Sequence, residues 1–216
     1  MAKEMVKKLR RWGWLLGAAL AMGCLATTGC DGDGPVFVTS LQPVYTQLDL
    51  EADSRLNGVW NDKEGDVTFS FEQGSEEGKT NEYKLMVKEK NAERDVSGEF
   101  EAHLVRLGST YFLDIYPQSN EKGSEFYRLH FARAHTFARM EISEDSIQLE
   151  FMSASWLKAR MDDKSVDTPC VKVDGALLLT GTTEDVRELV SFHANDDEAF
   201  TDPVVLEKQK AVEEAQ

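Results

Sequence analysis

Short segments in which apolar and polar residues alternate are the feature that most constrains the fold of this chain. Residues 67–72 show the alternation, and residues 83–87 and 99–104 repeat it. A period of two is typical of a β-strand that buries one of its faces. Because several of these segments follow one another directly, they favour an antiparallel sheet over a parallel one.

Short polar connections between the predicted strands indicate hairpins. Gly108-Ser109, Glu144-Asp145 and Asp174-Gly175 each separate two apolar segments. Asp-Gly suits a type I′ turn, so the third hairpin, between residues 170–173 and 176–179, has the strongest signal. Residues 73–82 contain no apolar side chain and predict a longer loop.

Two segments predict helices rather than strands. Residues 154–162 carry apolar side chains at helical spacing, with Ser153 as the N-cap. Residues 183–194 do the same, and Thr182 with Asp185 predicts a capping box. The chain is therefore expected to be mainly β. It would form an antiparallel barrel or strongly curved sheet of about eight or nine strands with two short helices.

The first thirty residues have the order of an export signal. Basic residues lie at positions 3–11, an apolar stretch covers 12–25, and small residues then lead to Cys30. This order is typical of a signal peptide. A membrane-spanning helix needs about 20 apolar residues. Glycine and threonine dilute the stretch, but an uncleaved anchor stays open as an alternative.

The residues before Cys30 resemble a bacterial lipobox, in which small residues precede a cysteine. The resemblance implies cleavage before Cys30 and a thioether-linked diacylglycerol on it, with palmitate as an acyl chain. Thr27 stands where such boxes usually have leucine, and Cys24 is a rival site. Each buried CH₂ of a lipid contributes about 0.8 kcal/mol, so two or three chains anchor a protein firmly. We expect a lipoprotein on the periplasmic face of a bacterial envelope, in either the inner or the outer membrane. In enterobacterial lipoproteins an aspartate directly after the cysteine, as at Asp31, favours the inner membrane.

These signals divide the chain into four parts. Residues 1–29 are the expected signal peptide, and 30–54 are the lipidated cysteine and a tether. Residues 55–208 form a single β domain, and 209–216 are a charged tail.

The mature chain is strongly acidic. The leader removes five of the 24 basic residues and one of the 39 acidic ones, which leaves a formal net charge of −19. Such a charge argues against nucleic-acid binding and favours cationic or neutral partners.

One short motif resembles the first strand of lipocalins. Gly58-Val59-Trp60 matches their Gly-x-Trp, whose tryptophan closes one end of the barrel and packs against a basic residue of a late strand. Residues 98–117, 134–142 and 179–190 are similar to a group of uncharacterised bacterial proteins, many of them lipoproteins. That similarity implies a fold and no activity.

The expected function is non-enzymatic, without a cofactor. The first hypothesis is that the barrel binds a small apolar or amphipathic molecule. The alternative is a filled barrel that docks an envelope protein through its acidic surface or residues 118–131. A hydrolase using Asp114 or His135 is a third hypothesis. The candidate ligand-binding residues are Trp60, Phe71, Leu85, Phe100, Leu113 and Asp114.

Asp114 is unusual because it lies between Leu113 and Ile115 in an apolar strand. It would point into a polar pocket, or it would face solvent or pair with an arginine. The candidate arginines are Arg106, Arg133 and Arg139.

The remaining chemistry-bearing residues give little signal. The histidines at 103, 130, 135 and 193 lack the spacing of a metal motif such as His-Glu-x-x-His, so no metal site is expected. Cys170 would be left without a disulfide partner. A small buried side chain is the expectation for it, and nothing local supports a thiol nucleophile.

Overall fold

The structure is a computed structural model that describes residues 37–76, 78–90, 95–118, 132–173 and 176–209. The predicted signal peptide, Cys24 and Cys30 lie outside the described residues. So do Asp31, His130, nearly all of 118–131, and all but the first residue of the tail.

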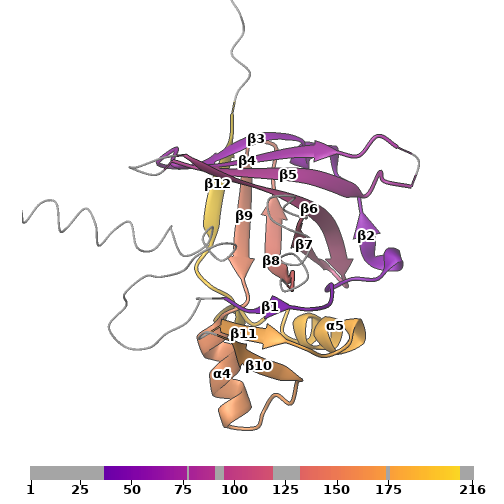
Figure 1. Ribbon diagram of the computed structural model, residues 1–216, viewed down its shortest axis with the longest axis vertical. Coiled ribbons are helices and arrows are strands. Elements are labelled where there is room, and N and C mark those ends of the chain that lie inside the picture. Colours follow the sequence, from indigo (N-terminus) through magenta and orange to yellow (C-terminus); the bar gives the residue numbers. More distant parts are fainter. Residues whose placement is uncertain (1–36, 77, 91–94, 119–131, 174–175, 210–216) are drawn as a thin grey trace, which may run out of the picture.

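Eight antiparallel strands close into a barrel (Figure 1). Seven successive strands, β3 to β9, pair in sequence order, and β12 closes the ring by pairing with both β9 and β3. The predicted antiparallel barrel is therefore confirmed. The strands are β3 (Gly58–Asp62), β4 (Val67–Gln73), β5 (Glu82–Glu89), β6 (Val96–Leu107), β7 (Thr110–Pro117), β8 (His135–Ile142), β9 (Ser146–Phe151) and β12 (Val204–Lys208).

The alternation seen in the sequence fixes which side chains fill the barrel. On β5, Tyr83, Leu85 and Val87 are buried while the residues between them face outward. The other strands contribute in the same way, since successive side chains of a strand point to opposite faces. Phe69 and Phe71 of β4 belong to the same core, with ring centroids 6.3 Å apart.

The predicted hairpins join the strands. Gly108 has a φ of +63°, a conformation that a residue with a Cβ adopts at a cost, and it begins the turn between β6 and β7. Residues 143–145 join β8 to β9, where Ser143 N–H bonds the Ser146 carbonyl. The predicted turn at 174–175 lies outside the described residues, but the strands beside it pair in the expected register.

A smaller layer, here called the cap, covers part of the outer face of the barrel and lies below it in Figure 1. The hairpin at 170–179 belongs to this layer and not to the barrel. It extends from β1, which pairs antiparallel with β8 and parallel with β11. The cap consists of β1 (Thr39–Ser40), α4 (Ala154–Asp162), β10 (Cys170–Val173), β11 (Ala176–Leu179) and α5 (Thr183–Phe192).

The cap and the barrel share a second hydrophobic core. Val105, Phe112 and Phe137 project from the outside of the barrel and pack among apolar residues of the cap, such as Leu157 and Val186. The helix caps are those that the sequence predicts: Ser153 accepts from Trp156 N–H, and Thr182 forms the box with Asp185.

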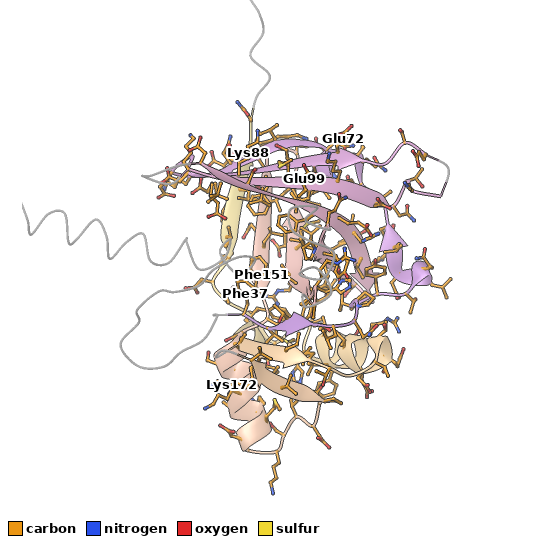
Figure 2. The ribbon with its side chains drawn as sticks, in the orientation of Figure 1. Phe37, Glu72, Lys88, Glu99, Phe151 and Lys172 are labelled. Carbon is orange, nitrogen blue, oxygen red and sulfur yellow. The ribbon has the colours of Figure 1, made fainter. Side chains whose placement is uncertain are left out.

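Residues 37–54 were expected to belong to a tether, but in the structure they pack on the barrel and the cap. Phe37 packs on Phe151 of β9 with ring centroids 5.0 Å apart, and Figure 2 shows the two side by side. Val38 and Val44 are fully buried. The remaining short elements of this region and of the chain end are η2 (Gln47–Asp49), β2 (Leu50–Glu51), which pairs with β6, η3 (Ser54–Leu56) and η4 (Asp197–Ala199).

Candidate functional site

Five of the six predicted ligand-binding residues point into the barrel and belong to its core, namely Trp60, Phe71, Leu85, Phe100 and Leu113. Trp60, Leu85 and Leu113 have no accessible surface, and Phe71 and Phe100 keep only 4 and 6 %. A side chain that lines a cavity large enough for water retains accessible area. The space beside Trp60, Leu85 and Leu113 is therefore filled by other side chains, as an eight-stranded barrel permits.

Trp60 of β3 has no accessible surface, and its partners come from both ends of the domain sequence. Its indole N–H donates to the Leu56 carbonyl at 2.9 Å. The Nζ of Lys208, on the last strand, lies 4.8 Å from the centre of the indole ring and also donates to the Arg55 carbonyl. A cation over an aromatic face is attracted to it, so this pair fixes β12 against the start of the barrel.

Asp114 does not join the other five predicted residues. Leu113 and Ile115 point inward on β7, so Asp114 points outward, where it is completely buried. Its carboxylate accepts the Val44 N–H at 3.0 Å and the His135 Nδ1–H at 2.7 Å. Of the alternatives for Asp114, pairing with an arginine does not occur among the described residues: Arg139 pairs with Glu150 and Arg106 with Glu51, while Arg133 lies over the ring of Tyr116.

Asp114 belongs to a line of polar side chains that crosses the outer face of the barrel, which we call the polar row. Its members share a face because their strands are in register: Glu82 of β5 lies opposite His103 of β6, and His103 lies opposite Asp114 of β7. Glu101 is two residues before His103 and therefore on the same face. The polar row is Glu82, Glu101, His103, Asp114 and His135.

The polar row lies at the border of the cap. Beyond it on β6, Val105 and Leu107 are buried under the cap, whereas Glu99 on the other side is exposed and points away from the barrel (Figure 2). His103 is therefore a polar residue at the edge of an apolar layer, and it keeps only 7 % of its surface.

His103 has Tyr45 on one side of its ring and Glu101 on the other. Its Nδ1 lies 3.1 Å from the Tyr45 hydroxyl, and the two rings have centroids 4.8 Å apart. Its Nε2 is 3.7 Å from Oε1 of Glu101, which is too long for a hydrogen bond. Burial lowers the pKa of His103, and the nearby Asp114 carboxylate opposes this only in part. Burial also raises the pKa of Tyr45, with the same carboxylate adding to the shift.

The hydrolase hypothesis needs Asp114 and His135 within hydrogen-bond reach, and the structure brings them together. Nucleophilic catalysis also needs a hydroxyl or thiol at the other ring nitrogen. Within the described ranges, no hydrogen bond joins Nε2 of His135 to a serine, threonine or cysteine. The pair instead fixes the backbone of Val44, and His135 stacks on Tyr116 with centroids 4.3 Å apart.

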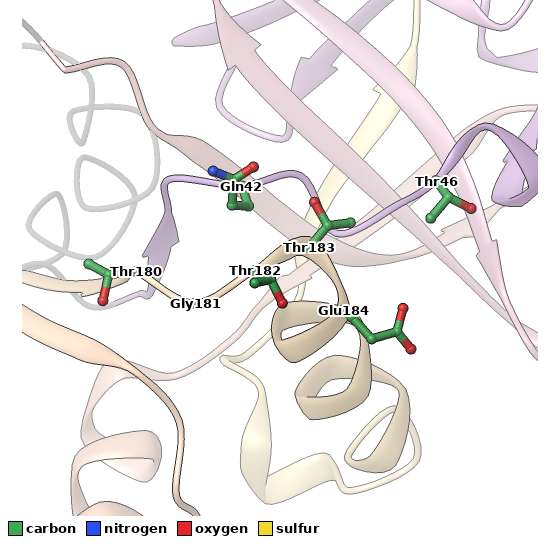
Figure 3. A pocket seen from close by; sticks show the side chains of 7 residues that line it. All are labelled: Gln42, Thr46, Thr180, Gly181, Thr182, Thr183 and Glu184. Atoms are coloured by element: carbon green, nitrogen blue, oxygen red, sulfur yellow. The ribbon is translucent and has the colours of Figure 1, made fainter.

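A surface pocket of about 590 Å³ lies between the segment after β1 and the start of α5. Figure 3 shows Gln42 on one side and Thr182, Thr183 and Glu184 at the beginning of the helix. A helix N-terminus attracts anions when its N–H groups are free. Here Asp185 accepts the Thr182 N–H at 2.7 Å and brings a negative charge, so the pocket does not suit an anion.

Cys170, expected to be buried, is partly exposed on β10 and packs against the second core. Burial raises the pKa of its thiol, which disfavours the thiolate that a nucleophile requires.

No family model matches this chain, and neither the curated proteins nor the solved structures contain a match to it. Among the described residues, the helices fall short of the length and apolarity needed to cross a membrane.

Sequence reasoning missed Tyr45 and most of the polar row. Glu101 and His103 are spaced by two, which places them on one face of a strand, and that signal was present in the sequence. Their neighbours Glu82 and Asp114 depend on the register of three strands, and Tyr45 depends on how the segment before η2 crosses them.

Proposed function

We propose that this protein is an exported lipoprotein, anchored through lipid on Cys30, whose barrel is a filled scaffold that docks an envelope protein. What supports the anchor is the order of basic, apolar and small residues before Cys30. What supports docking over carriage of a small molecule is one observation, the absence of accessible surface at Trp60, Leu85 and Leu113 inside the barrel.

The docking surface that we favour is the edge of the cap formed by β10. Among the described strands, β10 pairs only with β11, and Figure 1 shows it on the side of the cap away from the barrel. Val171 and Val173 are 45 and 48 % exposed. A free strand edge with exposed apolar side chains can accept an extended segment of another protein. Lys172 between the valines disfavours pairing of two copies at this edge.

The anchor is tested with Cys30→Ala and its matched control Cys24→Ala, each in the full chain expressed in a bacterial host. We expect Cys30→Ala to abolish incorporation of labelled palmitate and Cys24→Ala to leave it unchanged. If Cys24→Ala loses the label and Cys30→Ala keeps it, the lipid is on Cys24. If neither protein incorporates palmitate, the proposal that the protein is a lipoprotein is refuted.

The docking surface is tested with Val173→Asp, and Val205→Asp on β12 is the control, because Val205 is also exposed, at 43 %. A photo-crosslinking residue at position 171 in living cells is expected to give one discrete protein adduct. Val173→Asp should remove that adduct and Val205→Asp should keep it. Native mass spectrometry decides against the proposal if the chain carries a small molecule that solvent extraction and Leu85→Trp both remove.

A further inference from the structure

We propose that Glu82, Glu101 and His103 bind a divalent transition-metal ion on the outer face of the barrel, with Zn²⁺ as the best-matched ion. This site is separate from the barrel interior and from the β10 edge, and it does not depend on the docking role. One imidazole nitrogen and one oxygen from each carboxylate all lie within 4.8 Å of one another.

The pairing of β5 with β6 places these three ligands on one face of the sheet. Glu82 and His103 are direct partners across β5 and β6, and Glu101 is two positions before His103 on the same face. Zn²⁺ binds nitrogen and oxygen at about 2.0–2.2 Å, which places two ligands of a tetrahedral ion about 3.4 Å apart. Nε2 of His103 is already 3.7 Å from Glu101, and both glutamates are only partly buried, so their side chains can close the remaining distance.

His103 is the independent indication that this is more than a group of acids. It is more than nine-tenths buried, and its Nε2 is directed at Glu101 without a hydrogen bond among the described residues. A neutral imidazole offers its unprotonated nitrogen to a metal ion as a lone pair. Nε2 and the two carboxylates lie close enough for one bound cation to engage all three groups.

Among the described residues, no side-chain nitrogen of a lysine or arginine lies within 4 Å of a carboxylate oxygen of Glu82 or Glu101, although Lys84 is the cross-strand neighbour of Glu101. The nearby Lys84 pairs with Glu99 at 3.8 Å, and Lys79 pairs with Glu76 at 2.9 Å. Neither carboxylate is therefore held in a salt bridge by one of these two lysines, and both can turn toward a bound ion.

The kinds of ligand atom, one imidazole nitrogen and two carboxylate oxygens, indicate which metal ion fits the site. Ca²⁺ and Mg²⁺ prefer oxygen ligands throughout, whereas an imidazole favours Zn²⁺ and its neighbours in the first transition row. Three protein ligands leave a fourth position of a tetrahedral ion for water or for a group of another molecule. In the bound form Nδ1–H of His103 donates to the Tyr45 hydroxyl oxygen, so Tyr45 acts on the ion through His103 as a positioning residue.

The test is calorimetric titration of the full chain, purified in detergent, with Zn²⁺. We expect one saturable equivalent per chain, and no comparable binding of Ca²⁺. His103→Gln, Glu82→Gln and Glu101→Gln should each weaken binding at least tenfold, and Tyr45→Phe by about tenfold. Glu99→Gln on the same strand and His193→Gln on the cap are matched controls and should leave the affinity unchanged.

The site is refuted if the wild-type protein binds no Zn²⁺, or if His103→Gln and Glu101→Gln bind it as tightly as the wild type. Glu101 is partly exposed, so Glu101→Gln keeps the test valid even if His103→Gln does not fold. Co²⁺ provides a second readout, because its visible spectrum reports the ligands. Thiolate-to-metal charge transfer in that spectrum would place the ion on a cysteine and overturn the proposal.

Discussion

Leu85 offers the most direct test of whether the barrel is filled. It lies on β5 between Phe71 of β4 and Phe100 of β6, and none of its surface is accessible. Leu85→Ala removes three carbon groups, worth about 0.8 kcal/mol each, or about 2.4 kcal/mol of transfer free energy. The cavity left behind adds to this, so we expect a loss of about 3–5 kcal/mol in the free energy of unfolding.

The opposite substitution distinguishes a filled barrel from a hollow one. In a filled barrel Leu85→Trp overpacks the interior and costs about 1–3 kcal/mol, whereas in a hollow one it occupies empty space. Urea unfolding followed by far-UV circular dichroism measures both variants, with Val205→Ala as an exposed control that changes stability by less than about 1 kcal/mol. If Leu85→Trp is as stable as the wild type and Leu85→Ala costs less than about 1.5 kcal/mol, the filled barrel is refuted.

Three further substitutions test the contacts around the barrel, each by its urea midpoint. Lys208→Ala should cost about 1–2 kcal/mol, because it removes the cation from the Trp60 ring, and an unchanged midpoint would show that β12 closes the ring without it. Asp114→Ala should cost about 1–3 kcal/mol, because the buried Val44 N–H loses its acceptor; a loss within 0.5 kcal/mol would contradict that account. Burial lowers the pKa of His193, so the folded protein binds the proton less readily than the unfolded one. Stability should therefore be constant above about pH 6.5 and fall as the pH drops below it, and His193→Gln should fall less steeply; parallel curves would argue against this role.

Much of the barrel was predictable because its signals are local. The alternation over 67–72 and 83–87 sets the faces of β4 and β5, and the turn at Gly108 joins the next pair. Ring closure was not predictable in the same way. It depends on the pairing of β12 with β3. In this pairing Lys208 of β12 lies opposite Trp60 of β3, although the two residues are far apart in the sequence. The sequence left a barrel and a curved sheet as alternatives for that reason.

The cap shows a second limit of sequence patterns. Asp174-Gly175 between two apolar segments predicts a hairpin over residues 170–179, but a turn signal does not say which sheet a hairpin joins. The parallel pairing of β1 with β11 sets the position of this hairpin. Because β1 has only two residues, it leaves no strand pattern in the sequence. The same short strand carries the segment that was expected to be a tether into the folded domain, because Val38 and Val44 bury apolar side chains there.

The candidate site illustrates why the polar residues were harder to predict than the apolar ones. Asp114 was recognised as unusual because its neighbours in the chain are apolar, yet its partners come from segments that are distant in sequence, at Val44 and His135. A metal motif was sought at helical spacing, whereas the strand places Glu101 and His103 on one face at a spacing of two. The third ligand, Glu82, becomes visible only through the register of β5 with β6.

The two faces of the barrel wall thus have different roles. Most inward positions are occupied by apolar side chains, which leave Leu85 and Leu113 without accessible surface. Outward positions at the border of the cap hold His103 and Asp114, which are buried although they are polar. Buried polar groups lower stability unless they are paired, and Asp114 has its partners in Val44 and His135. His103 is paired at Nδ1 by Tyr45 and lacks a hydrogen bond at Nε2 among the described residues. Chemistry at this domain is therefore expected on the outside of the barrel, where the imidazole of His103 faces two carboxylates.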